Sequence, residues 1–140
     1  VHGSLFAFHC EWRNQMFELT IIEEFEAAHR LPDYEGKCCR LHGHNWKVEV
    51  SVRGSSLDSS GLLMDFKVLK SHVAEVLTTL DHYYLNETPA FSSLPPTAEH
   101  IAKYVYDTLA NNPAFSDRVK VYAVRVWESP RSCASYIPEA

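Results

Sequence analysis

Three histidines in the first third of the chain have the residue type and the spacing of metal ligands. His42 and His44 alternate along a segment with the pattern of a strand, so both imidazoles leave the backbone on the same side. His29 ends the preceding strand-like segment, and pairing of the two segments would bring it alongside as a third ligand. Three neutral imidazoles with an open fourth position are typical of a catalytic zinc site, whereas structural sites use four ligands rich in cysteine. The spacing therefore predicts a zinc site with catalytic chemistry.

The thiol of Cys38 precedes the histidine pair by four residues. An isolated cysteine is most simply a small buried hydrophobe. Lys37 and Arg40 flank Cys38, however, and cationic neighbours together with a nearby metal favour the thiolate form. We therefore expect Cys38 to be a reactive thiol and not a metal ligand. Cys39 would point the opposite way along an extended backbone, and we assign it to packing.

Asp81 and His82 form a carboxylate–imidazole pair at the end of a predicted helix. One interpretation is a surface pair, in which the helix dipole favours a cationic histidine. The other is a general base with its orienting group, because a carboxylate fixes the tautomer of the histidine that it holds. The spacing leaves both interpretations open.

Glu128 has the same parity as Val124 and Val126 in a predicted strand, so it projects from an apolar face. A carboxylate there is unfavourable unless it is paired. Either a protein arginine or the guanidine-like edge of a ligand would satisfy it. Glu99, by contrast, lies in the first turn of a predicted helix, where a carboxylate is favourable without a ligand.

Hydrophobic periodicity predicts the elements that position these residues. Alternation indicates strands over 17–29 and 42–53, and Asp65 and Thr97 are expected to cap two helices. The first helix should bury one stripe of side chains: Phe66, Leu69, Val73, Val76, Leu77 and Leu80. The second should bury Ile101, Tyr104, Val105, Thr108 and Leu109. Strands over 119–127 and 133–137 complete the order ββααββ, and the first of them is apolar on both faces, which suggests a second subunit or a barrel against one face.

Length, charge and cysteine spacing limit the class of protein. The chain has 140 residues and a formal net charge of -5, so one domain is expected, with no broad attraction for nucleic acid or anionic membranes. No apolar run approaches the roughly 18 residues that span a bilayer. The four cysteines are irregularly spaced, which favours reduced thiols and a cytoplasmic protein. We assign residues 1–15 to an N-terminal extension and residues 16–140 to a single domain.

A competing pattern is the first metal motif of the cupin barrels, His-x-His followed by a glutamate within five residues. Glu49 stands at that position. Its parity is opposite to that of His42 and His44, and two good helices fit poorly with a small all-strand barrel. We therefore disfavour the cupin interpretation.

Several extended segments together resemble one family. They are FEAAHRLP, CCRLHGH, GLLMDF, LDHYYLN, PTAEHIAKYVYD and WES. In this order they are similar to motifs of the 6-pyruvoyl-tetrahydropterin synthase superfamily, most closely to its 6-carboxy-tetrahydropterin synthase branch of queuosine biosynthesis. The resemblance covers about residues 17–137, and motifs in a fixed order are more specific than any single motif. It implies an α+β tunnelling fold (T-fold), in which ββααββ units assemble as a homo-hexamer of two trimers.

The resemblance implies roles for the metal ligands and the thiol. His29, His42 and His44 match the zinc ligands of the family. Cys38 matches the catalytic thiol of the carboxy-forming branch, whereas the pyruvoyl-forming enzymes typically have a longer spacing between that cysteine and the histidine pair. Cys39 stands where relatives often have a small residue.

The resemblance also implies roles for the polar residues elsewhere in the chain. Asp81 and His82 match the Asp-His pair of the family, and Glu128 matches the carboxylate that anchors the pterin. Thr97 and Glu99 match a segment that contributes to the pocket. The expected triphosphate contacts are Arg30, Lys37 and Arg40.

The implied reaction is a zinc-dependent conversion of 7,8-dihydroneopterin triphosphate to 6-carboxy-5,6,7,8-tetrahydropterin, with release of acetaldehyde and triphosphate. One alternative is a 6-pyruvoyl-tetrahydropterin synthase, which eliminates triphosphate and keeps the side-chain carbons. Another is a zinc-stabilised pterin-binding protein without turnover. The spacing from Cys38 to His42 speaks against the first alternative, and the joint presence of Cys38, Asp81 and His82 speaks against the second.

Overall fold

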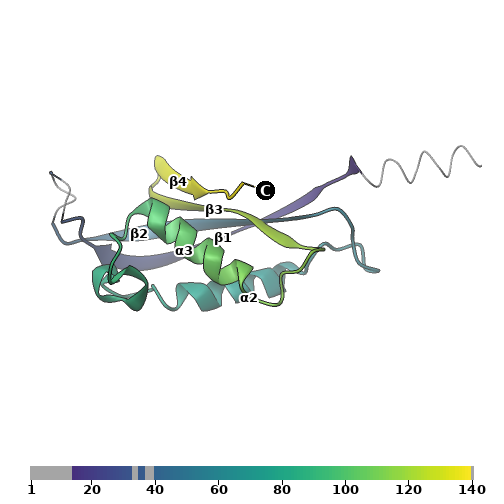
Figure 1. The fold of residues 1–140 in the computed structure, drawn as a ribbon, viewed down its shortest axis with the longest axis horizontal. Coiled ribbons are helices and arrows are strands. Elements are labelled where there is room, and N and C mark those ends of the chain that lie inside the picture. The colour runs from purple at the N-terminus through teal and green to yellow at the C-terminus, as the bar shows by residue number, and fades with distance from the viewer. Residues whose placement is uncertain (1–13, 33–34, 37–39, 140) are drawn as a thin grey trace, which may run out of the picture.

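The computed structural model describes residues 14–32, 35–36 and 40–139. A four-stranded antiparallel sheet forms its centre, in the order β1 (Phe17–His29), β2 (His42–Gly54), β3 (Lys120–Ser129) and β4 (Ser132–Tyr136). The helices α2 (Phe66–Leu77) and α3 (Ala98–Ala110) lie side by side against one face of this sheet (Figure 1). Two short 3-10 turns, η2 (Leu85–Glu87) and η3 (Pro89–Phe91), connect the helices. The predicted order ββααββ and the α+β class are confirmed.

Alternating side chains of β1 and β2 build the core under the helices. Trp46, Val48 and Val50 of β2 are fully buried, as are Ile21 and Phe25 of β1 within a few per cent. The pairing aligns these sets, with Phe25 opposite Trp46 and Ile21 opposite Val50. The indole N–H of Trp46 donates to the carbonyl of Ala27 at 3.2 Å. The strand parity predicted from the sequence is therefore correct for both strands.

Both helices begin at the predicted caps. The Asp65 carboxylate accepts from the N–H of Lys67 at 2.8 Å, and the Thr97 hydroxyl accepts from the N–H of His100 at 3.1 Å. These bonds satisfy N–H groups that the first helical turn leaves unpaired. The predicted stripes are wrong at two positions, because Phe66 and Thr108 are exposed. Leu80 is buried as predicted, but it lies beyond the end of α2.

A bulge changes the parity of β3. Val50 pairs with Val124, but Val52 pairs with Val121, so the register shifts between Ser51 and Val52. Val121 therefore joins the helix-covered core together with Val124 and Val126. Strict alternation along 119–127 would put Val121 and Val124 on opposite faces, and this expectation is wrong because of the bulge. The extra residue in β3 changes which side chains point toward the helices, so residues of opposite parity on its two sides share one face.

The segment after α2 covers part of the edge of the sheet. β1 is an edge strand, and its Ala28 N–H donates to the carbonyl of Tyr83 at 3.2 Å, while Glu26 exchanges backbone contacts with Asp81 and His82. His82 has a φ of 63°, a left-handed conformation that is uncommon for a residue with a side chain. Within the described residues, no helix is long and apolar enough to cross a membrane.

Candidate metal site and the Asp81–His82 pair

Three histidines and one glutamate converge at one end of the helix-covered sheet face. His29 is the last residue of β1 and pairs with His42, the first residue of β2, while His44 pairs with Ala27. Glu128 joins them from β3. One donor atom from each of these four side chains lies within 4.8 Å of the others. The structure thus brings together the three histidines that the sequence predicts as ligands.

Backbone carbonyls fix the tautomers of two of the imidazoles. Nδ1 of His29 lies 2.9 Å from the carbonyl oxygen of Pro96, and Nδ1 of His42 lies 2.7 Å from that of Arg40. A carbonyl oxygen only accepts, so both Nδ1 atoms carry hydrogen and both neutral rings have a lone pair on Nε2. These two Nε2 atoms are 2.9 Å apart. Two facing lone pairs repel each other unless a cation lies between them.

His44 places a third imidazole nitrogen beside the Nε2 atoms of His29 and His42. Its Nε2 is buried and has no hydrogen-bond partner, although Oε1 of Glu128 lies 3.2 Å away. A buried polar atom without a partner is unfavourable, so such atoms call for an explanation such as an ion. Imidazole nitrogens whose other N–H is held by a carbonyl are the usual arrangement around a bound transition metal. The donor set therefore fits a divalent metal ion.

Burial keeps the cluster in its metal-binding form. Desolvation lowers the pKa of His29 below its ordinary value, and the bond to Pro96 and the charge of Glu128 only partly oppose this. Desolvation also lowers the pKa of His44, again against Glu128. Neutral imidazoles are the form that binds metals, because a ligand nitrogen must be deprotonated. At neutral pH His29 and His44 are therefore ready to bind a cation.

Glu128 faces the imidazoles, with Oε1 also 4.0 Å from Nε2 of His29. Its expected parity, shared with Val124 and Val126, agrees with this position. The sequence argument expected it to pair with an arginine or with a ligand. In the described chain its carboxylate instead lies beside the imidazoles of the histidine cluster. The carboxylate thus adds a negative charge that favours a cation here.

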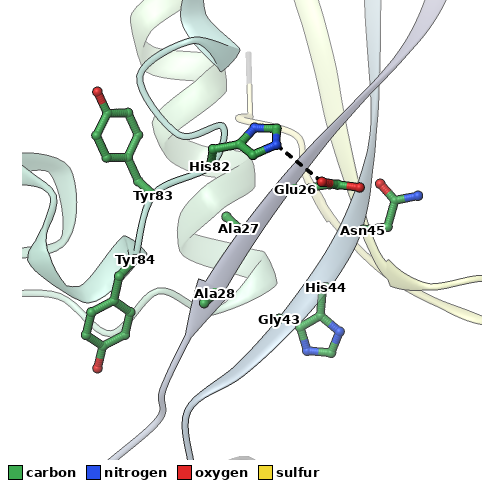
Figure 2. Close-up of a pocket in the computed structure, with 9 residues that line it drawn as sticks. All are labelled: Glu26, Ala27, Ala28, Gly43, His44, Asn45, His82, Tyr83 and Tyr84. Atoms are coloured by element: carbon green, nitrogen blue, oxygen red, sulfur yellow. Dashed lines mark ion pairs between the residues drawn. The ribbon is translucent and has the colours of Figure 1, made fainter.

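Asp81 and His82 contact each other but lie apart from the imidazole cluster. Oδ1 of Asp81 is 2.9 Å from Nδ1 of His82, and it also accepts from the N–H of Glu26, which lowers the pKa of Asp81. The His82 ring reaches toward Glu26, whose partner across the sheet is Asn45. Side chains alternate between faces along a strand, so Glu26 and His44 lie on opposite faces. Figure 2 shows His82 directed at Glu26 and His44 directed away from both.

An open pocket of about 490 Å³ connects these two regions across the end of β1 and β2. Its walls are Glu26, Ala27, Ala28, Gly43, His44, Asn45, His82, Tyr83 and Tyr84 (Figure 2). Glu26, Tyr83 and Tyr84 lie within the segments FEAAHRLP and LDHYYLN, but no role of their own was assigned to them from the sequence. Charged residues at alternate positions of a strand are typical of a solvent-exposed face. Only the pairing of the 81–84 segment with β1 identifies Glu26 and the two tyrosines.

The remaining predicted residues lie around the cluster or outside the described chain. Arg40 is exposed and holds His42 through its carbonyl. Arg30 exchanges two hydrogen bonds with the Asn86 side chain through its backbone. Thr97 follows the carbonyl that holds His29 and caps α3, and Glu99 is exposed in the first turn of that helix. Cys38, Lys37 and Cys39 lie outside the described residues.

The cupin interpretation fails on geometry. Oε1 of Glu49 accepts from the indole N–H of Trp127 at 3.0 Å and lies 3.8 Å from Nζ of Lys47. These side chains occupy the sheet face opposite the helices, as the parity of Glu49 predicted. Glu49 is therefore not part of the histidine cluster.

Comparison with known proteins places these features in one family. The family model described as 6-pyruvoyl tetrahydropterin synthase matches residues 18–139. A protein of Synechocystis named 6-carboxy-5,6,7,8-tetrahydropterin synthase is 41% identical over 119 residues, which is 80% of this chain and 86% of that protein. A protein of the same name from Bacillus subtilis is 39% identical over 136 residues, covering 88% of this chain and 86% of that one.

The fold has a counterpart among solved structures. The 6-pyruvoyl tetrahydropterin synthase of Caenorhabditis elegans superimposes with a TM-score of 0.78 at 28% sequence identity. The match covers 89% of this chain and 97% of that one. The sheet with its two helices is thus the fold of a pterin synthase structure.

Proposed function

This chain belongs to the 6-pyruvoyl tetrahydropterin synthase family, and we propose that it is a carbon–carbon lyase that makes 6-carboxy-5,6,7,8-tetrahydropterin. The substrate would be 7,8-dihydroneopterin triphosphate, and the other products would be acetaldehyde and triphosphate. The reaction would belong to queuosine biosynthesis. Relatives that carry the 6-carboxy name at 41% and 39% identity support this choice.

The observation that carries the chemistry is the pair of Nε2 atoms of His29 and His42, 2.9 Å apart, both with lone pairs. We assign His29, His42 and His44 as the ligands of a zinc ion. When bound, zinc would supply Lewis-acid stabilisation of oxygen anions on the substrate. Imidazole donors suit zinc but also suit several other transition metals, so the identity of the ion is part of the proposal.

Proton transfer is assigned to Cys38 and His82. The thiolate of Cys38 would take or return one proton on the substrate side chain, and His82 would handle another while Asp81 orients its ring. The 2.9 Å contact between Asp81 and Nδ1 of His82 supports this orienting role, because it leaves Nε2 as the nitrogen assigned to proton transfer. Cys38 is assigned through its position four residues before His42.

Assembly of several copies would bring the two halves of the site together. Within one chain, the Glu26 and His82 side chains meet on the sheet face opposite His44. A homo-hexamer of two trimers, as the family resemblance implies, would let His82 of one copy approach the histidine cluster of another. The Asp81–His82 pair is exposed, with 72% of the His82 side chain accessible, and is thus free to meet a second subunit.

Substrate contacts are assigned around the cluster. Glu128 would anchor the pterin ring, and its position beside His44 supports a pterin held next to the metal. Thr97 and Glu99 start the helix that follows the Pro96 carbonyl and would line the same pocket. The triphosphate would meet cationic side chains, for which we propose Arg30, Lys37 and Arg40.

A second candidate is the pyruvoyl-forming reaction, which eliminates triphosphate without cleaving the side chain. The structural match to the synthase of Caenorhabditis elegans favours it to some extent. Incubation of the zinc-loaded protein with dihydroneopterin triphosphate, followed by mass spectrometry, separates the candidates. Acetaldehyde with a 6-carboxy pterin supports the proposed lyase. A pyruvoyl pterin would move the chain to the second activity, and unchanged substrate at saturating concentration would leave a binding protein.

A further inference from the structure

Glu26 contacts the Asp81–His82 pair through three separate groups. Its backbone N–H donates to Oδ1 of Asp81 at 2.9 Å, and its backbone carbonyl accepts from the N–H of His82. Its carboxylate Oε2 lies 3.4 Å from Nε2 of His82. The backbone contacts exist because β1 is an edge strand, so its outward N–H and carbonyl groups are available to the loop. One residue of β1 thus holds both members of the pair.

Among the residues that the structure describes, the contacts of the His82 ring are those with Glu26 and Asp81. With 72% of its side chain accessible, packing does not fix its orientation. Asp81 lies at Nδ1 of the ring. Glu26 lies at Nε2 (Figure 2), so a carboxylate stands at each ring nitrogen. Carboxylates only accept hydrogen bonds. Both contacts are therefore hydrogen bonds when both ring nitrogens of His82 carry hydrogen. This doubly protonated ring is also the form that can donate a proton to a substrate.

The backbone of His82 also needs to be held. Its φ of 63° is uncommon for a residue with a side chain, and such conformations persist where the surroundings determine them. The carbonyl of Glu26 accepts from the N–H of this same residue. The backbone of Glu26 thus fixes the position of the His82 backbone. The carboxylate of Glu26 fixes the orientation of the His82 ring.

We propose that Glu26 is a positioning residue for His82, an inference that rests on the proposed proton transfer by His82. The carboxylate of Glu26 holds the ring in one orientation until substrate takes its place at Nε2. Glu26 contacts this ring nitrogen but is assigned no proton transfer with the substrate. Its loss should therefore lower kcat while KM and bound metal stay unchanged.

The test compares Glu26→Ala with Glu75→Gln, a control at an exposed carboxylate of α2 that is not among the hydrogen-bond or ion-pair partners of Asp81 and His82 in the described chain. We expect Glu26→Ala to lower kcat about tenfold, less than the roughly hundredfold or greater loss expected when a general acid is removed. KM and zinc content should remain within twofold of wild type. Glu26→Asp should recover part of the lost rate because it restores a carboxylate. Equal kcat in Glu26→Ala and Glu75→Gln would overturn the proposal.

A double-mutant cycle separates positioning from an independent effect. In a His82→Ala background, Glu26→Ala should cost less than about twofold, because contacting residues that act together are not additive. The same tenfold loss in both backgrounds would show that Glu26 acts without His82 and would refute the inference. Thermal unfolding of each variant checks that the chain is folded.

A spectroscopic measurement keeps this inference separate from the proposed reaction. Ring ¹⁵N shifts of His82, read without substrate, should change in Glu26→Gln and stay unchanged in Glu75→Gln. Such a change with no turnover by the wild-type enzyme would support the positioning contact and refute only the proposed function. Unchanged shifts in Glu26→Gln would refute the contact, whatever the activity.

Discussion

The Nε2 atoms of His29 and His42 lie 2.9 Å apart, and the opposite nitrogen of each ring is held by a backbone carbonyl. Neither Nε2 can donate to the other while both rings are neutral. Protonation of one ring would remove the repulsion, but burial lowers the pKa of His29 and disfavours this. A metal ion resolves the conflict without a buried proton.

Replacement of His42 by Ala should abolish tight metal binding. Because loss of a residue that merely orients a ligand costs about 10–100-fold in affinity, loss of the ligand itself should cost more than about a hundredfold. Metal content after dialysis, with competition by a chelator, measures this. His100→Ala is the control, since its ring lies against the Pro95 carbonyl and not in the cluster. Full metal retention by His42→Ala would remove His42 from the ligand set.

The metal-free protein should lose stability as the pH falls below about 6.5. Folding lowers the pKa of His29 and His44 from the 6.5 of the unfolded chain. As the pH falls, the unfolded chain therefore binds protons before the folded chain does. The contribution of the two histidines to the free energy of unfolding is fully present above pH 6.5, and it is lost as the pH falls from 6.5 toward their lowered pKa values in the folded chain. Thermal midpoints from pH 7.5 to 5 measure the slope. His44→Gln should flatten it, and a slope unchanged by this substitution would contradict the burial argument.

Cys38→Ala should stop turnover and leave metal binding intact. The thiol is assigned to proton transfer and not to the ligand set, and a positioned acid–base group contributes about 10²–10⁴-fold. Product formation and metal content are measured together, with Cys39→Ala as the matched control from the adjacent position. If Cys39→Ala were inactive and Cys38→Ala active, the two assignments would have to be exchanged.

Gly54→Ala should destabilise the fold by about 1–3 kcal/mol through overpacking. A Cβ at Gly54 would overlap the carbonyl oxygen of Arg118 and Cδ1 of Leu63. Gly43 is the matched control, because a Cβ there meets nothing within 4 Å, and Gly43→Ala should change the free energy of unfolding by less than about 0.5 kcal/mol. Urea denaturation measures both. A similar loss in both variants would indicate a general effect of glycine replacement.

Local patterns in the sequence were sufficient for much of the fold. Strict alternation from His42 through Val50 predicts which residues of β2 are buried, and the same alternation puts His29 on the inner side of β1. Asp65 and Thr97 mark the helix starts because their side chains bond to nearby backbone groups, which is a local interaction. Pairing of β1 with β2 then brings the three histidines together without further information.

Long-range relationships could not be predicted in the same way. The bulge in β3, opposite Ser51 and Val52, is not visible in the sequence of either strand, since it depends on how two distant segments pair. The tautomer of His29 depends on Pro96, 67 residues away, which no periodicity links to it. The contact of Glu26 with His82 likewise depends on a loop that meets the edge of β1. Residues far apart in sequence meet only through the packed fold.

The bulge in β3 also separates the pairing register of the two ends of this strand, so each end sets independently which of its side chains face the helices. From Val124 to Trp127 the pairing with β2 sets which side chains face the histidines, while the stretch near Val121 follows a shifted register. A gain or loss of one residue on the Val121 side could therefore be taken up at the bulge, whereas the same change after Val124 would turn Glu128 to the other face. Length variation among related chains should accordingly be tolerated before the bulge and excluded after it.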